Sequence, residues 1–129
     1  MKKTIATEAA PRAIGPYSQA VRAGQWVFCS GQIGLDPASG ELVAGGVVAE
    51  AERVLENLRA VLTAAGGSLD SVVRTTVYLI DLAEFGRVNE IYERHFTAPF
   101  PARATVGVAA LPRGARVEID AVALIEVES

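Results

Sequence analysis

The sequence contains only one cysteine and one histidine among its 129 residues. A single thiol cannot form an internal disulfide, and a structural zinc site needs several Cys or His ligands, so we expect no metal site. No apolar run approaches the about 20 residues that span a bilayer. Residues 1–8 carry positive charge but lack the apolar segment of a signal peptide. We therefore expect a cytoplasmic protein without a membrane partner.

Positive charge is also scarce. The chain has 12 Lys and Arg against 15 Asp and Glu, which gives a net charge of −3 and a pI of about 5.2. Nucleic-acid binding needs clustered Lys and Arg, so we expect no nucleic-acid partner. The chain also lacks a glycine-rich phosphate loop and a Gly-x-Ser-x-Gly motif. We expect an activity that needs no cofactor.

Apolar residues, in contrast, make up 50% of the chain, and charged residues make up 21%. This length and composition predict one globular domain over residues 1–129, long enough for a real core. The apolar surplus is consistent with a buried subunit interface, although a compact monomer could also absorb it.

Apolar and β-branched runs predict the strands. We expect short strands at 3–7, 19–21 and 26–30, the last two forming a hairpin around Ala23-Gly24. The β-branched run 72–80 predicts a central strand. Two more strands and two helices complete the order β, β, β, helix, β, helix, β, β. This order predicts a two-layer α+β domain with a mixed sheet and both helices on one face.

Helical spacing identifies the two helices. Apolar residues recur at this spacing from Ala51 to Ala65, and Gly66-Gly67 would end the helix. The pairs Glu50/Arg53 and Glu56/Arg59 would lie on its outer side. Asp81 and Glu84 have the spacing of a capping box for the second helix. The side chains expected to face inward from that helix are Phe85, Val88, Tyr92 and Phe96, with Asn89 beside them.

The stretch 101–125 organises the chain. It reads as two strands joined by a turn, in which Pro112 has its φ preset and Gly114 can take a positive φ. Glu118 and Asp120 are two residues apart and therefore share one face of the second strand. Beyond them this strand is apolar on both faces, which is typical of a strand covered on both sides. Because the chain is too short to supply a second layer easily, we expect self-association.

Six residues are candidates for chemistry, and the alternatives given below for Glu118 apply to Asp120 as well. Arg103 could hold a carboxylate with two hydrogen bonds, or it could be a surface arginine or a partner for Glu118. Glu118 could act as a general acid/base or position a water, or it could be an exposed strand residue. Tyr17, Ser30 and Gly31 lie at loop and strand ends, where ligand-binding groups are common. We interpret Cys29 and His95 as structural residues.

Taken in order, several segments resemble the RidA/YjgF family of enamine/imine deaminases. No single segment is diagnostic, but the ordered set runs from one end of the chain to the other and is highly specific. The matching segments are 14–20 (IGPYSQA), 30–33 (SGQI), 57–66, 75–79 (TTVYL), 88–92 (VNEIY), 101–103 (PAR), 111–112 (LP) and 117–119 (VEI).

The resemblance implies a chorismate-mutase-like α+β fold and a homotrimer, with the sheets forming a barrel and active sites between subunits. It also implies that Arg103 binds the substrate carboxylate and that Glu118 positions the hydrolytic water. The positions that would line the substrate cleft are Tyr17, Ser30, Gly31, Asn89 and Thr105.

Two features depart from the family pattern. Thr105 stands where many members have cysteine, so regulation through a thiol is not expected there. The loop 97–100 is shorter than in some relatives, which could alter the substrate range.

The resemblance implies hydrolysis of 2-aminoacrylate, 2-iminopropanoate and 2-iminobutanoate to 2-keto acids and ammonia, which protects pyridoxal-phosphate enzymes from damage. Other functions stay open at this point. One is a non-catalytic trimer that senses small carboxylates, and another is a chaperone-like role. A ribonuclease activity is disfavoured by the acidic pI.

Overall fold

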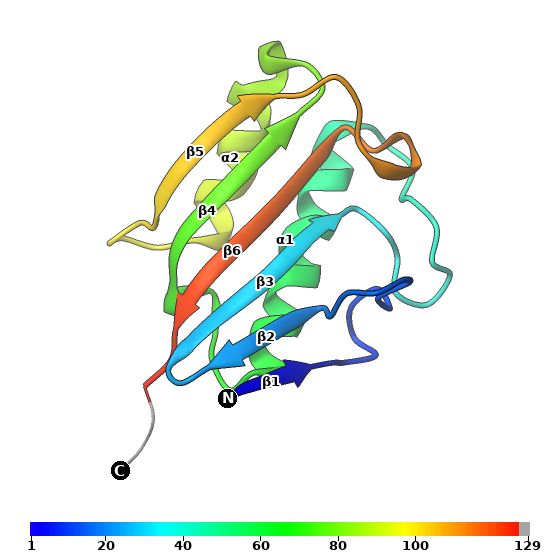
Figure 1. The fold of residues 1–129 in the computed structure, drawn as a ribbon. Coiled ribbons are helices and arrows are strands. Elements are labelled where there is room, and N and C mark those ends of the chain that lie inside the picture. The colour runs from blue at the N-terminus through cyan, green and yellow to red at the C-terminus, as the bar shows by residue number, and fades with distance from the viewer. Residues whose placement is uncertain (127–129) are drawn as a thin grey trace.

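The computed structural model describes residues 1–126 (Figure 1). The predicted order of strands and helices is confirmed, although the first strand begins and ends earlier than expected. Along the described chain the elements are β1 (Lys2–Ile5), β2 (Ala20–Ala23), β3 (Trp26–Ile33), α1 (Val47–Ala64), β4 (Val72–Leu79), α2 (Phe85–His95), β5 (Ala102–Gly107) and β6 (Val117–Leu124).

The strands form one mixed sheet in the order β1-β2-β3-β6-β4-β5 (Figure 1). Only the β4–β5 pair is parallel among the described strand pairs. The expected β2–β3 hairpin is confirmed, since Ala23 pairs with Trp26 and Gly24 has a φ of 61°. Strand β6 lies between β3 and β4, so it is a central strand. Of its two faces, the one that carries Ile119 and Ala121 is buried in the core.

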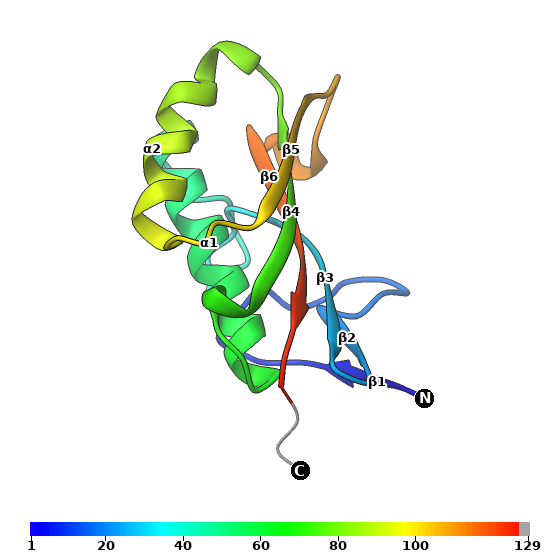
Figure 2. The ribbon, with the colours of Figure 1, turned by 90° about the vertical axis from the view of Figure 1, so that its left-hand side faces the viewer.

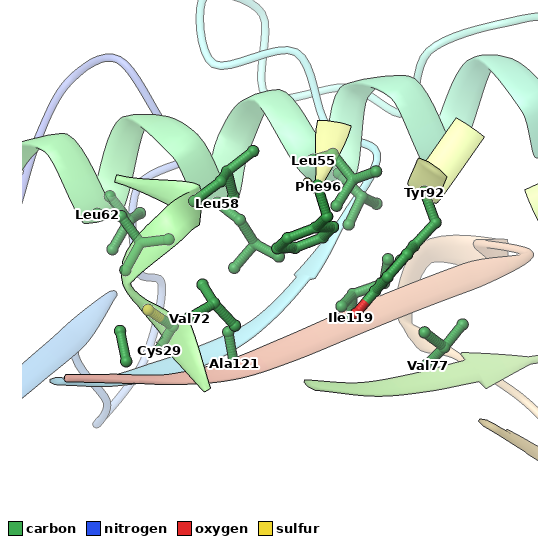
Figure 3. Packing of buried hydrophobic residues seen from close by; sticks show 14 of the residues in the cluster. Cys29, Leu55, Leu58, Leu62, Val72, Val77, Tyr92, Phe96, Ile119 and Ala121 are labelled. Atoms are coloured by element: carbon green, nitrogen blue, oxygen red, sulfur yellow. The ribbon is translucent and has the colours of Figure 1, made fainter. Parts of the chain in front are cut away.

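Both helices pack on one face of the sheet, as expected (Figure 2). The core lies between them and the sheet, and Figure 3 shows side chains from both layers meeting there. The buried apolar side chains of helix α1 run from Val47 to Leu62. The chain turns away from the helix at Gly66, which has a φ of 93°. Neither α1 nor α2 is both long and apolar enough to cross a membrane. The largest core side chains of α1 and the sheet are Leu55, Leu58, Leu62, Leu79 and Ile119.

The expectation that Glu50 lies on the outer side of α1 is wrong. Its side chain is buried, and its Oε1 accepts a hydrogen bond of 2.7 Å from the Arg116 amide. The reason is that α1 begins at Val47, so Glu50 lies in the first turn beside the segment that leads into β6. The second predicted pair is confirmed, with 3.9 Å between Arg59 Nε and Glu56 Oε1.

Only one of the two hydrogen bonds of the predicted capping box forms. Asp81 Oδ1 accepts a hydrogen bond of 2.9 Å from the Ala83 amide, as a cap should. Glu84 does not reach back, because its carboxylate pairs with Arg87 at 3.2 Å. A 3₁₀ turn over Leu82–Glu84 intervenes, so α2 begins at Phe85.

The turn after β5 has the predicted glycine conformation. Pro112–Gly114 form a 3₁₀ turn in which Gly114 has a φ of 72° and Arg113 has a φ of 61°. The two strands that it joins are not neighbours, because β4 lies between β5 and β6. The turn therefore returns the chain to the centre of the sheet.

The face of the sheet opposite the helices, which we call the open face, is covered by neither helix (Figure 2). Along β6 the side chains alternate, so that Ile119 faces the core whereas Val122 and Leu124 face away from it. Across from these two, Phe28 is 50% exposed and Trp26 is 43% exposed. A contiguous apolar face of this kind is typical of an interaction surface.

Candidate active site

Arg103 lies near the start of β5, and its side chain packs against α2. Its Nη1 donates a hydrogen bond of 2.8 Å to Asn89 Oδ1. Its guanidinium carbon is 4.7 Å from the ring centroid of Tyr92 and 5.1 Å from that of Phe85. These contacts hold a planar cation in one orientation by cation–π attraction and one hydrogen bond. A guanidinium has five N–H donors, so donors remain for a ligand.

The aromatic support of Arg103 was not predicted as part of the site. Phe85, Asn89 and Tyr92 are four and seven residues apart along α2, which places them on one helix face. That spacing is the signal that could have identified these residues as a binding surface for an arginine. From the sequence alone, Phe85 and Tyr92 are expected only in the core.

The side chain of Tyr92 is held in place by Thr75 and Phe96. Its Oη is 2.8 Å from Thr75 Oγ1, and its ring centroid is 4.4 Å from that of Phe96 (Figure 3). Burial raises the pKa of Tyr92, so the phenol stays neutral at physiological pH. The ring under the Arg103 guanidinium therefore belongs to the rigid core.

Thr105 also faces the helices. It lies two residues after Arg103, is half-buried and pairs with the buried Val77 of β4. Arg103, Asn89 and Thr105 thus form one group of predicted site residues, on the helix side of the sheet.

Glu118 lies on the open face, near the start of β6. It is half-buried, and its register partners are Tyr78 on β4 and Ile33 on β3. Burial raises the pKa of Glu118, and the negative charge of Asp120 raises it further. A carboxyl group of this kind can gain and lose a proton closer to neutral pH than an ordinary one.

Gly31 makes room for the Glu118 carboxylate. A Cβ atom at position 31 would lie 2.8 Å from Glu118 Cδ, closer than real side chains approach. The register runs from the pair Cys29–Ala121 directly to Gln32–Ile119, so Ser30 and Gly31 together oppose Asp120 in a β-bulge. Bulges of this kind are common beside active sites because they re-aim backbone and side chains.

Ser30 anchors the loop that carries Tyr17. Its Oγ donates a hydrogen bond of 2.6 Å to the Ser18 carbonyl, and its amide donates to the Gln19 carbonyl at 3.0 Å. Tyr17 is 55% exposed and lines a groove of about 890 Å³ that it shares with the N-terminal segment and the 35–40 loop. The Ile14 amide donates to Tyr17 Oη at 3.4 Å.

Within one chain, the predicted site residues form two groups and no single pocket. Glu118, with Gly31 and the Ser30 bulge, lies on the open face, whereas Arg103 and Asn89 lie on the helix side.

The two residues interpreted as structural lie in structural positions. Cys29 is buried, and burial together with the Asp120 charge raises its pKa to about 12. His95 Nε2 is 2.8 Å from Glu52 Oε2, and its Nδ1 is 3.3 Å from Arg59 Nη2, so it joins α2 to α1. Among the residues that the structure describes, no group of three His, Cys, Asp or Glu side chains is placed to hold a metal ion.

The protein is thus a small α+β domain. Arg103, packed on two aromatic rings, and the half-buried Glu118 lie on opposite faces of its sheet. The model of the endoribonuclease L-PSP family matches residues 7–125. The chain therefore belongs to this family, the RidA/YjgF/L-PSP family.

Several relatives cover nearly the whole chain. Protein DfrA of Myxococcus xanthus is 61% identical over 125 residues, which cover 95% of each chain. The 2-iminobutanoate/2-iminopropanoate deaminase of Mus musculus is 56% identical, and the match covers 96% of this chain and 92% of the mouse protein.

Solved structures of relatives share the fold. The crystal structure of RidA from an Antarctic Psychrobacter superposes with a TM-score of 0.93 at 50% identity, covering 95% of this chain and 99% of that one. The E. coli TdcF structure with bound serine superposes with a TM-score of 0.91 at 41% identity, covering 96% and 99%.

Proposed function

We propose that this chain is a deaminase that hydrolyses 2-aminoacrylate, 2-iminopropanoate and 2-iminobutanoate to 2-keto acids and ammonia. The observation that carries the proposal is the Arg103 guanidinium, held by Asn89 and two aromatic rings with donors left for a carboxylate. The mouse relative, which is named for this activity, is 56% identical over nearly the whole chain. In a cytoplasmic setting the reaction would protect pyridoxal-phosphate enzymes from reactive imines.

Arg103 binds the substrate by its carboxylate. The remaining N–H groups of the guanidinium form a fork that matches the two oxygens of a 2-imino acid. Because the rings of Phe85 and Tyr92 restrict the guanidinium, the substrate is oriented without a further entropic cost for the arginine. This contact fixes the position of C2, the carbon that water must attack.

Glu118 handles the protons of the reaction. It accepts a proton from water as the water oxygen bonds to C2, and it passes this proton to the nitrogen as the C=N bond becomes a C–N bond, which gives a carbinolamine. It then takes the proton of the new hydroxyl group as the C=O bond forms and delivers it to the nitrogen, so that the C–N bond breaks and ammonia leaves. The raised pKa of Glu118 suits both steps, and positioning supplies much of the remaining acceleration.

We further propose that the active unit is a homotrimer with sites between subunits. Two observations support it: Arg103 and Glu118 lie on opposite faces of one sheet, and the open face exposes apolar side chains such as Phe28 and Trp26. Packing of open faces would bury this apolar surface. It would also allow Arg103 of one subunit to approach Glu118 of the next.

A coupled assay tests the proposal. A serine or threonine dehydratase generates the imine, and 2-keto acid formation is followed with the wild type, Arg103→Ala and Arg103→Lys. We expect acceleration by the wild type, loss with Arg103→Ala and only partial retention with Arg103→Lys, because lysine lacks the planar fork. Full activity of Arg103→Ala in an intact oligomer would overturn the assignment.

A binding protein for small carboxylates is the second candidate, because a relative in this fold was solved with bound serine. The Glu118→Gln variant separates the two functions. A binding protein would keep its affinity for serine and would show no turnover to lose, whereas the deaminase would lose turnover while still binding the carboxylate. A ribonuclease function is disfavoured, because 15 acidic residues outnumber 12 basic ones.

A further inference from the structure

Asp120 is a second carboxylate on the open face, two residues after Glu118, and each of its oxygens has a donor on β4. Tyr78 Oη donates to Asp120 Oδ2 at 2.9 Å, and the Thr76 amide is 3.2 Å from Asp120 Oδ1. An ionised carboxylate only accepts hydrogen bonds. The two donors therefore match a charged carboxylate and fix its orientation.

The strand register brings this carboxylate close to the proposed acid/base group. Tyr78 is the register partner of Glu118, and Thr76 is the partner of Asp120. The Tyr78 side chain thus starts beside Glu118 and reaches diagonally to Asp120, as long side chains do between neighbouring strands. On the β3 side, the bulge formed by Ser30 and Gly31 lies opposite Asp120.

We propose that Asp120 is a positioning residue for Glu118: the Asp120 carboxylate, held by Tyr78 and the Thr76 amide, acts on Glu118 from the same face of β6 while Glu118 exchanges a proton with the attacking water. This inference rests on the proposed function, since it concerns the same reaction. Imine hydrolysis needs one group that first takes a proton from water and then gives one to the departing nitrogen.

The other groups around Glu118 leave this role to Asp120. The Arg103 guanidinium lies on the far side of the sheet, and the Arg116 guanidinium lies beside Gly46 at the start of α1. Within one chain both cations are therefore directed away from the Glu118 carboxylate, and Arg74, which shares the open face, pairs with Val122 beyond Asp120. In the proposed trimer, Arg103 of the next subunit brings a positive charge toward Glu118, which the charge of Asp120 opposes. The side chains that face Glu118 from neighbouring strands are those of the neutral phenol Tyr78 on β4 and of Ile33 on β3, with Gly31 beneath the carboxylate.

The energetic direction agrees with the geometry. The pKa of Glu118 is raised first by burial and then by the charge of Asp120. Removing that charge should therefore lower the pKa of Glu118 and leave it a weaker base. The burial contribution would remain, so the acid/base function should be reduced and not abolished.

The test compares Asp120→Asn with Glu126→Gln, a matched control that also removes one negative charge but lies beyond the far end of β6. Two measurements are made on the full-length oligomer: the pH profile of kcat in the coupled assay, and the pH titration of the Glu118 side-chain carboxyl by 13C NMR. Asp120→Ser serves as a second neutral variant if Asp120→Asn melts at a much lower temperature.

We expect the Glu118 titration midpoint and the acidic limb of the kcat profile to move together to lower pH in Asp120→Asn. We also expect kcat at neutral pH to fall several-fold while KM stays within about twofold. Glu126→Gln should leave both curves unchanged. A purely structural role for Asp120 would lower stability without moving the titration.

Failure of this inference is distinct from failure of the proposed function. An unchanged Glu118 titration in both neutral variants, with an active wild type and an inactive Glu118→Gln, would overturn the role of Asp120 alone. No acceleration by the wild type would overturn the deaminase proposal, and with it this inference, whatever the NMR titration shows.

Discussion

The carboxylate of Glu118 lies against Gly31, so that a Cβ atom at position 31 would be 2.8 Å from Glu118 Cδ. Gly31 has an ordinary φ, and its lack of a side chain matters only for this close approach. The glycine and the acid therefore form one unit, although they are far apart in sequence. Any side chain at position 31 must displace the carboxylate.

This relationship predicts that Gly31→Ala lowers kcat far more than it lowers stability. Displacement of a catalytic group by about 1 Å can cost about a hundredfold in rate, whereas overpacking at one position costs about 1–3 kcal/mol. Coupled-assay kinetics and thermal melting would measure the two effects. Gly86→Ala is the control, since nothing lies within 4 Å of the added Cβ and position 86 is in helix α2. Equal kinetics in both variants would contradict the assignment.

The placement of Arg103 and Glu118 on opposite faces leads to a complementation experiment. Arg103→Ala and Glu118→Gln should each be inactive, but co-expressed subunits should assemble sites that combine the intact Arg103 of one chain with the intact Glu118 of another. In a symmetric trimeric ring every mixed trimer has one such site out of three, so the hetero-trimers should show about a third of the wild-type activity. The specific activity of hetero-oligomers purified through two tags is the measurement. Absence of any recovery, with mixed oligomers present, would mean that sites are not shared between chains.

Much of the fold could be predicted because its signals are local. Apolar spacing over residues 51–65 and the β-branched run 72–80 indicate a helix and a strand without tertiary information. The end of α1 at Gly66 also follows from backbone chemistry. Glu50 was misplaced for the opposite reason, since the Arg116 amide that draws it inward is distant in sequence.

The site was predicted less completely. Arg103 and Glu118 could be singled out by residue type, but their separation onto two faces depends on which strands are neighbours. The bulge at Ser30 and Gly31 and the hydrogen bond from Tyr78 to Asp120 also depend on strand register. Register is set by long-range pairing, which no local pattern in this chain specified.

The contact between Asn89 and Arg103 predicts a binding defect. Asn89→Ala removes the 2.8 Å hydrogen bond that orients the guanidinium, while the aromatic rings remain. Because one hydrogen bond contributes about 0.5–1.5 kcal/mol, we expect KM to rise about twofold to tenfold with a smaller change in kcat. Arg87→Ala, which removes an exposed ion pair with Glu84 on the same helix, is the control. An unchanged KM in Asn89→Ala would show that Arg103 is oriented without Asn89.

The raised pKa of Cys29 predicts an unreactive thiol. The pKa rises from 9.0 to about 12, so at pH 8 the folded protein holds this group as the neutral thiol, which is a poor nucleophile. We expect negligible reaction with a disulfide reagent at pH 8 until a denaturant is added, and one thiol per chain afterwards. Rapid labelling of the native protein would show that this part of the core opens easily.

The exposed apolar residues of the open face predict how the subunits assemble. Phe28 is 50% exposed although it lies mid-strand, directly across from Val122. If open faces pack together in a trimer, Phe28→Glu places a charge in that interface, where an unpaired carboxylate is costly. We expect light scattering to report the mass of a single chain, with the far-ultraviolet circular dichroism unchanged. Activity should disappear with the oligomer, because Arg103 and Glu118 of one chain cannot reach the same substrate.

Leu82→Glu is the matched control, since Leu82 is 54% exposed but lies in the 3₁₀ turn before α2. A Phe28→Glu variant that remains trimeric and active would show that the open face is not the subunit interface.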